Sequence, residues 1–263
     1  MSSVSGPSVA DRVEAVAIEG LGEIVPGDDL PTLIAGALAG TTAVLPLRDD
    51  DVLVVTQKVV SKAEGAIVDL TTIEPRPVAI QFAERYDRDA RQVELVLREA
   101  KRVVRMDNGV VITETPHGFV CANCGIDASN VGPRSGDVVT LLPGDPDASA
   151  DRIRAAVRER LGHDLPVIVS DSFGRPWRFG IVDVAIGVSG IEPLDDLRGT
   201  PDADGRVMKS TVRAVVDEIA SVAELVFGKT ARRPLALVRG VTFRKGDGRI
   251  RDLIMPAETN LFR

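Results

Sequence analysis

Two aspartates have neighbours that suit the binding of a divalent cation. Asp171 stands at the end of the apolar run 166–170 and next to Ser172, and Asp127 lies on a polar loop that also holds Asn130. Carboxylate, hydroxyl and amide oxygens are the ligands that hard cations such as Mg²⁺ prefer. Each of the two aspartates is therefore a candidate ligand of a divalent cation. The structural alternative is that Asp171 caps a turn.

Cationic side chains that could bind phosphate follow two of the apolar runs. Lys58 and Lys62 lie in the segment 56–62, and Arg175 and Arg178 follow Ser172. An ammonium suits a phosphate as a point charge, and a guanidinium can bind phosphate or carboxylate with two hydrogen bonds. The sequence has no G-x-x-x-x-G-K-[ST] motif, so a nucleotide site here would not be a Walker P-loop. The alternative for segment 56–62 is a solvated turn with ordinary surface lysines, and the alternative for Arg178 is an ion pair with a surface acid.

Further acidic residues share one face of a helix that is predicted over 211–226. Glu224 follows Asp217 by two helical turns, so both carboxylates could approach one metal ion. Gly228 and Lys229 come next, where the glycine indicates the end of the helix. The alternative is that these acids are simply solvated, as most acids on amphipathic helices are.

The two cysteines, Cys121 and Cys124, form a C-x-x-C motif. Such a motif is compatible with redox chemistry or with zinc. Structural zinc normally needs four ligands, and the sequence has no second pair of cysteines. A mixed site with His117 would be crowded. We predict that the cysteines are two small buried residues.

Apolar patterns predict the elements that must position these residues. Asn108 and Gly109 mark the turn of a hairpin over 108–121. The predicted strands are 13–18, 52–56, 166–170, 185–188 and 235–238, and the predicted helices are 30–39, 81–103, 147–161 and 211–226. Strands and helices mix without a regular βαβ order, which favours an α+β fold with mixed sheets and packed helices over a doubly wound parallel sheet.

The predicted organisation is one domain over 11–263, preceded by a loose tail over 1–10. No Pro/Gly-rich linker divides the chain, although a sub-domain boundary could lie near 130–150. The charged segment from residue 244 onward is predicted to be peripheral.

The composition excludes several classes of protein. The net charge is −7 in 263 residues, which argues against a general nucleic-acid-binding protein. Aromatic residues make up only 3%, so the core must be aliphatic. No apolar run approaches the ~18 residues that a membrane span needs, and the N-terminus lacks the pattern of a secretion signal. The sequence therefore predicts a cytoplasmic protein with no membrane partner.

Several long stretches together resemble the coenzyme F420-0:L-glutamate ligase family, which includes a stand-alone archaeal enzyme and the N-terminal ligase domain of a bifunctional actinobacterial protein. The stretches are GDDL, DVLVVTQKVVSKAEG, HGFVCANCGIDASNVG, LPGDPDASADRIRAAVRERLG, VIVSDSFGRPWRFGIVDVAIG and DEIASVAELVFGK, followed by LALVRG. The resemblance covers nearly the whole chain.

The resemblance implies an F420 gamma-glutamyl ligase-like fold and GTP-dependent amide-bond formation. GTP would phosphorylate the terminal carboxylate of F420-0, and the amine of L-glutamate would attack the acyl phosphate. Many members add a second, gamma-linked glutamate. The implied ions are Mg²⁺ or Mn²⁺, up to two per site, with K⁺ as a further candidate, and the implied assembly is a homodimer. The acyl phosphate must be shielded from water, and the stretch 189–209 is the predicted closing loop.

The family's functional positions carry over by motif. The implied metal ligands are Asp127, Asp171, Ser172 and Glu224, so Asp127 and Asp171 are expected to converge on one cation although they are far apart in the sequence. The implied catalytic residues are Asp127, Asp171, Lys62 and Arg175. The implied guanine-nucleotide contacts are Leu21, Gly22, Glu23, Ile24, Gln57, Lys62, Asn130, Ala223, Glu224, Gly228 and Lys229. The sequence departs from the family at Cys124, where alanine is more common, and at Gln57, where some relatives have serine.

Two other functions are compatible with the same residues. One is a non-catalytic domain that binds a phosphorylated cofactor. The other is an amide ligase that acts on a different carboxylate.

Overall fold

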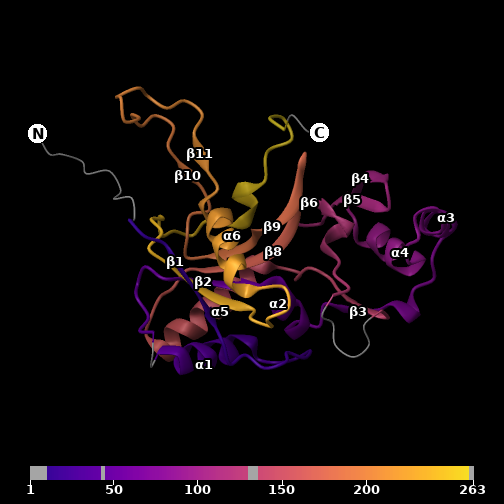
Figure 1. The fold of residues 1–263 in the computed structure, drawn as a ribbon, viewed down its shortest axis with the longest axis horizontal. Coiled ribbons are helices and arrows are strands. Elements are labelled where there is room, and N and C mark those ends of the chain that lie inside the picture. Colours follow the sequence, from indigo (N-terminus) through magenta and orange to yellow (C-terminus); the bar gives the residue numbers. More distant parts are fainter. Residues whose placement is uncertain (1–10, 43–44, 130–135, 261–263) are drawn as a thin grey trace, which may run out of the picture.

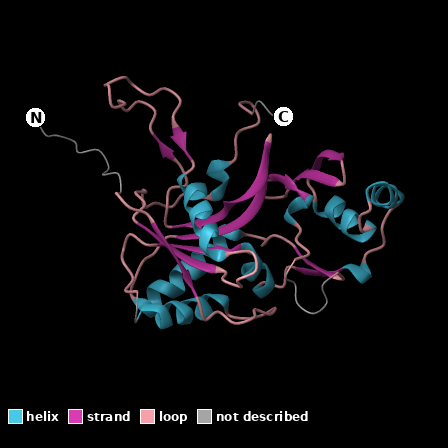
Figure 2. Ribbon diagram, viewed as in Figure 1, coloured by secondary structure: helices cyan, strands magenta, loops and turns pink. Residues whose placement is uncertain are grey.

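A five-stranded mixed sheet lies at the centre of the molecule and confirms the predicted α+β fold (Figure 1, Figure 2). This computed structural model describes residues 11–42, 45–129 and 136–260. β2 and β8 run parallel, whereas the other neighbouring strands are antiparallel. In spatial order the strands are β1 (Glu14–Ile18), β12 (Leu235–Arg239), β2 (Val52–Thr56), β8 (Val167–Arg175) and β9 (Arg178–Ser189). All five predicted strands belong to this sheet.

Helices cover both faces of the sheet, and each face has its own aliphatic core. α1 (Leu30–Thr42) and α5 (Pro146–Leu161) pack on one face together with side chains such as Leu53 and Val169. α6 (Val215–Phe227) packs on the other face against side chains such as Val54 and Ile168. Consecutive residues of the central strands are therefore buried on opposite faces, which explains their uninterrupted apolar sequences.

The helix predicted over 147–161 is confirmed and shows clear end signals. Asp145 caps its first turn by accepting a hydrogen bond from the amide of Ala148 at 2.9 Å, and Pro146 occupies the first helical position. Gly162 ends the helix with φ of 73°, a left-handed conformation that suits glycine.

A second group of elements lies beside the sheet, at the right of Figure 1. It contains two helices, two short paired strands, and a three-stranded sheet whose first turn is the predicted Asn108–Gly109 turn, with φ of 50° and 72°. Its apolar side chains form separate small clusters. The elements are β3 (Ile67–Asp69), α3 (Pro77–Tyr86), α4 (Ala90–Glu99), β4 (Arg102–Asp107), β5 (Val110–Glu114), β6 (Val120–Ala122) and β7 (Val138–Thr140).

Four predictions about local structure are wrong. The single helix over 81–103 is instead α3, α4 and the start of β4, because Asp87 adopts φ of 53° and breaks the helix. The segment 56–62 is mostly the helix α2 (Gln57–Ala63) rather than a turn. The late helix begins at Val215, because residues 212–213 form a strand.

The fourth error concerns the C-terminal segment, which is docked rather than peripheral. A short 3₁₀ helix, η3 (Ile250–Leu253), places Ile250 in the core beside α6. The amide of Ile250 donates to the carboxylate of Asp147, and Arg249 forms an ion pair with Asp151 at 2.9 Å.

A two-stranded arm projects from the body in Figure 1. It consists of β10 (Asp195–Asp196), β11 (Val212–Arg213) and the loop between them, in which Pro201 and Val207 form one more bridge. It includes most of the stretch predicted as a closing loop, and that role stays a prediction. In the described part of the chain, no helix has both the length and the apolar character to cross a membrane.

A buried ion pair joins β12 to the start of β2. The guanidinium of Arg239 donates to both carboxylate oxygens of Asp51 at 2.7 Å, and the two residues are only 6% and 0% exposed. Such a pair adds little to the free energy of unfolding compared with apolar residues of similar size. Removing one partner, however, leaves a buried charge without compensation.

We therefore expect Arg239→Met to lower the free energy of unfolding by about 3–5 kcal/mol. Urea unfolding of the purified proteins measures this loss. The control is Arg244→Met, because Arg244 is exposed, lies 3.9 Å from Asp195 and donates a 3.3 Å hydrogen bond to the carbonyl of Leu194; its effect should stay below about 1 kcal/mol. Equal effects of the two substitutions would contradict the expected cost of the unpaired charge.

Candidate functional site

Asp127 follows a turn of unusual backbone conformation. Asn123, Cys124 and Gly125 have φ of 51°, 57° and 69°, all in the left-handed region. A Cβ atom at Gly125 would lie only 2.8 Å from Leu142, so this position needs glycine. After the turn, the main chain of Asp127 pairs with Thr140 through hydrogen bonds of 3.0 and 2.9 Å. The strained turn thus delivers the Asp127 carboxylate to the end of β7.

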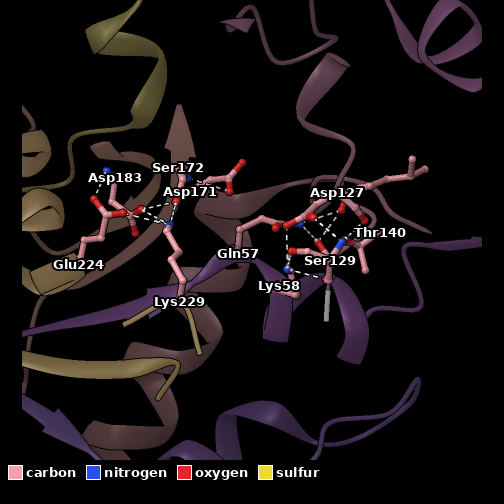
Figure 3. A network of polar contacts seen from close by, with 12 residues as sticks. Gln57, Lys58, Asp127, Ser129, Thr140, Asp171, Ser172, Asp183, Glu224 and Lys229 are labelled. Atoms are coloured by element: carbon pink, nitrogen blue, oxygen red, sulfur yellow. Dashed lines mark hydrogen bonds and ion pairs between the residues drawn. The ribbon is translucent and has the colours of Figure 1, made fainter. Parts of the chain in front are cut away.

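The carboxylate of Asp127 is held by one cation and one amide. Lys58 lies 2.7 Å from it, and the amide of Ser129 donates to it at 2.6 Å. Lys58 also donates to the carbonyl of Ser129 at 2.7 Å (Figure 3). Burial alone would raise the pKa of Asp127, but the contacts with Lys58 and Ser129 outweigh burial and lower it. The side chain is therefore a carboxylate at neutral pH.

Helix α2 brings Lys58 to this loop. Its first residue, Gln57, donates to the carbonyl of Leu141 at 2.8 Å, and Ser61 donates to the same carbonyl at 2.6 Å. Since Leu141 directly follows Thr140, the helix and Asp127 are both anchored at the end of β7. Gln57 is thus a buried structural contact as well as a predicted nucleotide contact.

Asp171 lies on β8 near Asp127. The pKa of Asp171 is raised to about 7, chiefly by burial and in addition by the negative charges of Asp183 and Asp127, against a hydrogen bond from the amide of Ser172 and the charge of Lys58. The influence of Asp127 means that the two carboxylates lie within electrostatic range. The structure thus brings together the two residues that the sequence predicts to converge, with Gln57 between them in the view of Figure 3.

A second polar cluster lies on the other side of β8. Ser172 donates to Asp183 at 2.6 Å, and Lys229 donates to the hydroxyl oxygen of Ser172. Lys229 also lies 3.0 Å from a carboxylate oxygen of Glu224. Burial raises the pKa of Asp183, and the nearby charge of Glu224 adds to this effect. The cluster contains the predicted residues Ser172, Glu224 and Lys229.

Asp183 was not among the predicted site residues. It stands inside the apolar stretch 181–188 on β9, directly opposite Ser172 on β8. The sequence could have indicated this residue, because a single charged residue within an apolar strand is unusual. Its partner could not be predicted, because the register of β8 and β9 pairs Asp183 with Ser172.

Lys62 lies one turn after Lys58 on α2 and pairs with a different acid. Its ammonium is 2.5 Å from Glu23, and the lysine is only 9% exposed. The loop that holds Glu23 also contains Leu21, which lines a cavity of about 270 Å³ together with Arg232 and Arg233. Of these three predicted nucleotide contacts, Lys62 and Glu23 pair with each other, and Leu21 lines the cavity.

Most of the other predicted residues are either buried in the cores or lie away from the two polar clusters. Ile24 and Ala223 are buried in the two cores, so a ligand could reach only their main chains. Gly228 ends α6 with φ of 62°. Arg175 lies at the far end of β8 and donates to the carbonyl of Phe179 at 2.7 Å within its own hairpin. Asn130 lies outside the described residues.

Both cysteines are buried, as predicted. Burial raises the pKa of Cys121 to about 12, and the charges of Cys124 and Asp171 act in the same direction. Burial also raises the pKa of Cys124. Both thiols are therefore protonated at neutral pH, which makes them weak nucleophiles.

The donor atoms of the site fit a hard divalent cation. Asp127, Asp171, Ser172 and Glu224 offer carboxylate and hydroxyl oxygens, which suit Mg²⁺ or Mn²⁺. Within the described ranges, His, Cys, Asp and Glu side chains do not gather in a group of three or more that could hold a metal ion by itself. The ammonium groups of Lys58 and Lys229 instead lie against the acidic side chains in this structure.

A family model described as F420-0:Gamma-glutamyl ligase matches residues 20–240. The chain belongs to the F420-0:gamma-glutamyl ligase family. Three similar proteins carry the name Coenzyme F420:L-glutamate ligase. The protein of Methanothermobacter thermautotrophicus is 40% identical over 95% of this chain and 99% of its own length. The protein of Methanocaldococcus jannaschii is 41% identical over 90% and 95%, and that of Methanopyrus kandleri 43% identical over 96% and 97%.

The matched span of the ligase family contains all of the residues predicted for the site. Both polar clusters, the loop at Glu23 and the end of α6 lie within it. Family membership therefore applies to the same part of the chain that carries the site.

The raised pKa of Asp171 has a consequence for stability in the metal-free protein. The folded chain holds this proton up to about pH 7, whereas an ordinary aspartate loses it near 3.8. The folded state therefore binds the extra proton between these values, so this group's contribution to stability falls as the pH rises from about 4 to about 7.

We expect Asp171→Asn to remove this dependence. The stability of the variant relative to wild type should increase between pH 5 and pH 8 by on the order of 1–3 kcal/mol, as measured by urea unfolding without metal. Asp127→Asn is the matched control, because the lowered pKa of Asp127 stabilises the fold above its unfolded pKa. That variant should be less stable than wild type at both values. A constant difference for Asp171→Asn would contradict the prediction.

Proposed function

We propose that the chain is a GTP- and metal-dependent ligase that joins L-glutamate to coenzyme F420-0. The observation that carries the proposal is that Asp127, paired with Lys58 at the start of α2, lies within electrostatic range of Asp171, in a chain of this family. Relatives that are 40–43% identical are named as ligases of coenzyme F420 and L-glutamate. Carboxylates that share a cation near a phosphate-binding lysine suit phosphoryl transfer.

The proposed reaction has two steps. A carboxylate oxygen of F420-0 attacks the γ-phosphorus of GTP, the bond to the β-phosphate oxygen breaks, and GDP leaves. The amine of L-glutamate then attacks the acyl carbon of the acyl phosphate, inorganic phosphate leaves, and the nitrogen loses a proton as the amide forms. Neither step needs a nucleophile from the protein, which agrees with the buried, protonated cysteines.

The residues of the chain have separate roles in this proposal. Asp127 and Asp171 would hold Mg²⁺ or Mn²⁺, and Ser172 and Glu224 would hold a second ion. The metal would neutralise the charge of the transferring phosphoryl group. Lys58 neutralises Asp127 in the ligand-free chain and would be free to turn to a phosphate once a metal replaces it. Arg175, which contacts its own hairpin, would act only if the hairpin end moved toward the substrate.

The nucleotide would lie along the loop that contains Leu21 to Ile24 and the end of α6. The cavity lined by Leu21, Arg232 and Arg233 could accept part of it. Gly22, Gly228 and the main chain at Ala223 would allow close approach of a ligand to the backbone. K⁺ as a further ion, a homodimeric assembly and a cytoplasmic location also belong to the proposal.

Mass spectrometry after incubation with F420-0, GTP, L-glutamate and Mn²⁺ tests the reaction. We expect a product that is heavier by one glutamate residue, or by two if a second is added, with GDP and phosphate released in equal amounts. Asp127→Ala and Asp171→Ala should abolish turnover. Binding of F420-0 or GTP without any product would favour the non-catalytic alternative, and turnover with another carboxylate alone would favour a different amide ligase.

Lys62 provides a separate test of the nucleotide site. We expect Lys62→Ala to weaken GTP binding roughly 10- to 100-fold, because a charge-assisted contact with a phosphate is worth about 1.5–3 kcal/mol. Lys62→Arg should restore the affinity only in part, since a planar guanidinium does not replace a point charge. Calorimetric titration with GTP measures both.

Lys101→Ala is the matched control for this experiment, because Lys101 also pairs with a carboxylate, that of Glu114, and is not among the predicted nucleotide contacts. This variant should bind GTP as tightly as wild type. Equal affinities for wild type and Lys62→Ala would show that Lys62 only pairs with Glu23.

A further inference from the structure

Asp183 links three residues of the candidate site to each other. It lies on β9 and is 4% exposed, so its carboxylate is almost fully removed from water. Figure 3 shows it beside Ser172, Glu224 and Lys229, which come from β8, the last turns of α6 and the segment after α6. Burial of a carboxylate is costly unless hydrogen bonds compensate for it, so its contacts indicate its role.

The carboxylate of Asp183 accepts hydrogen bonds from two serine hydroxyls. Ser172 donates to Oδ1 at 2.6 Å, and Ser170 donates to Oδ2 at 2.9 Å. An ionised carboxylate only accepts, so both hydroxyl hydrogens are committed to it. The oxygen of Ser172 therefore has its lone pairs free for a positively charged partner. In this structure the ammonium of Lys229 is that partner.

The main chain of Asp183 holds the other side of the cluster. Its amide donates to Oε2 of Glu224 at 3.0 Å, and its carbonyl accepts a hydrogen bond from Ser221 at 2.9 Å. The second carboxylate oxygen of Glu224 then faces Lys229 at 3.0 Å. Residue 183 thus orients Ser172 with its side chain and Glu224 with its backbone, and both present oxygen to the same cation.

We propose that Asp183 is a positioning residue for the ligase reaction: it fixes the Ser172 hydroxyl so that its oxygen faces the cation beside Glu224. This inference rests on the proposed function. Asp183 acts through Ser172 and does not itself touch the substrate. Groups that orient metal ligands commonly change metal affinity 10- to 100-fold when they are removed.

Asp217 is a natural comparison within the same helix–strand contact. Its carboxylate accepts a hydrogen bond from the amide of Ala185 on β9 at 2.9 Å, and burial raises its pKa as it does for Asp183. Asp217 thus contacts the backbone of β9, whereas Asp183 contacts the hydroxyl of Ser172. Substitution at Asp217 therefore reports the structural cost of losing a buried carboxylate at this interface.

The test is a titration with Mn²⁺, followed by electron paramagnetic resonance, in the presence of GTP. Asp183→Ala should weaken Mn²⁺ binding about 10- to 100-fold. Asp183→Asn keeps one acceptor oxygen and should fall between Ala and wild type, and it serves if the alanine variant does not fold. Asp217→Ala should stay within about twofold of wild type. Equal losses for Asp183→Ala and Asp217→Ala would overturn the inference.

A double-mutant cycle with Ser172→Ala separates positioning from a general structural effect. If Asp183 acts through Ser172, then Asp183→Ala should change the Mn²⁺ affinity of the Ser172→Ala protein by no more than about twofold. Full additivity of the two losses would overturn the inference.

Ligand-free crystal structures keep this test independent of the ligase reaction. In Asp183→Asn the Ser172 side chain should change its rotamer or occupy several, whereas in Asp217→Asn it should not. If wild type binds no Mn²⁺ with GTP, the proposed function fails, and these structures alone decide the role of Asp183. An unchanged Ser172 in both Asp183→Asn and Asp183→Ala would then overturn it.

Discussion

The parallel pairing of β2 with β8 is the contact on which the rest of the site depends. Its register places Thr56 beside Ser170, so Gln57, where the chain leaves the sheet as α2, lies level with Asp171, where β8 continues beyond its pairing with β2. Helix α2 begins at Gln57 without an intervening loop and carries Lys58 toward Asp127. The carboxyl ends of adjacent parallel strands are where ligand-binding groups commonly gather. A shift of this register would separate the two clusters.

The polar clusters contain charges that the fold alone does not require. Lys58 lies against Asp127, Lys62 against Glu23, and Lys229 against Glu224. Each pair joins a lysine that could bind a phosphate to an acid that could bind a cation or be displaced by one. In this structure the members of each pair compensate each other, which limits the free-energy cost of holding several partly buried charges in one region. In the proposed complex a metal ion would face the acids, and the phosphates of the nucleotide would face the lysines.

Separate elements impose rigidity on the two sides of the site. The left-handed turn before Asp127 and the shared anchor of Gln57 and Ser61 on Leu141 fix one side. The long antiparallel pairing of β8 with β9 fixes the other, since it sets Ser172 opposite Asp183. Side chains held by strands and by buried hydrogen bonds keep their geometry better than side chains on free loops.

The sequence by itself determined the α+β class, the central strands, the helix ended by Gly162, the Asn108–Gly109 turn and the burial of both cysteines. Periodicity and end signals act over short distances, so a single segment contains them. It also marked Asp127 and Asp171 as candidate metal ligands, and the structure places them within electrostatic range of each other. Only the tertiary structure decided that Lys58 rather than Lys62 contacts Asp127, that Asp87 divides a helix, and that Asp183 faces Ser172. Those outcomes depend on strand register and on contacts between distant segments, and no local pattern encodes which of two lysines on one helix faces a particular loop.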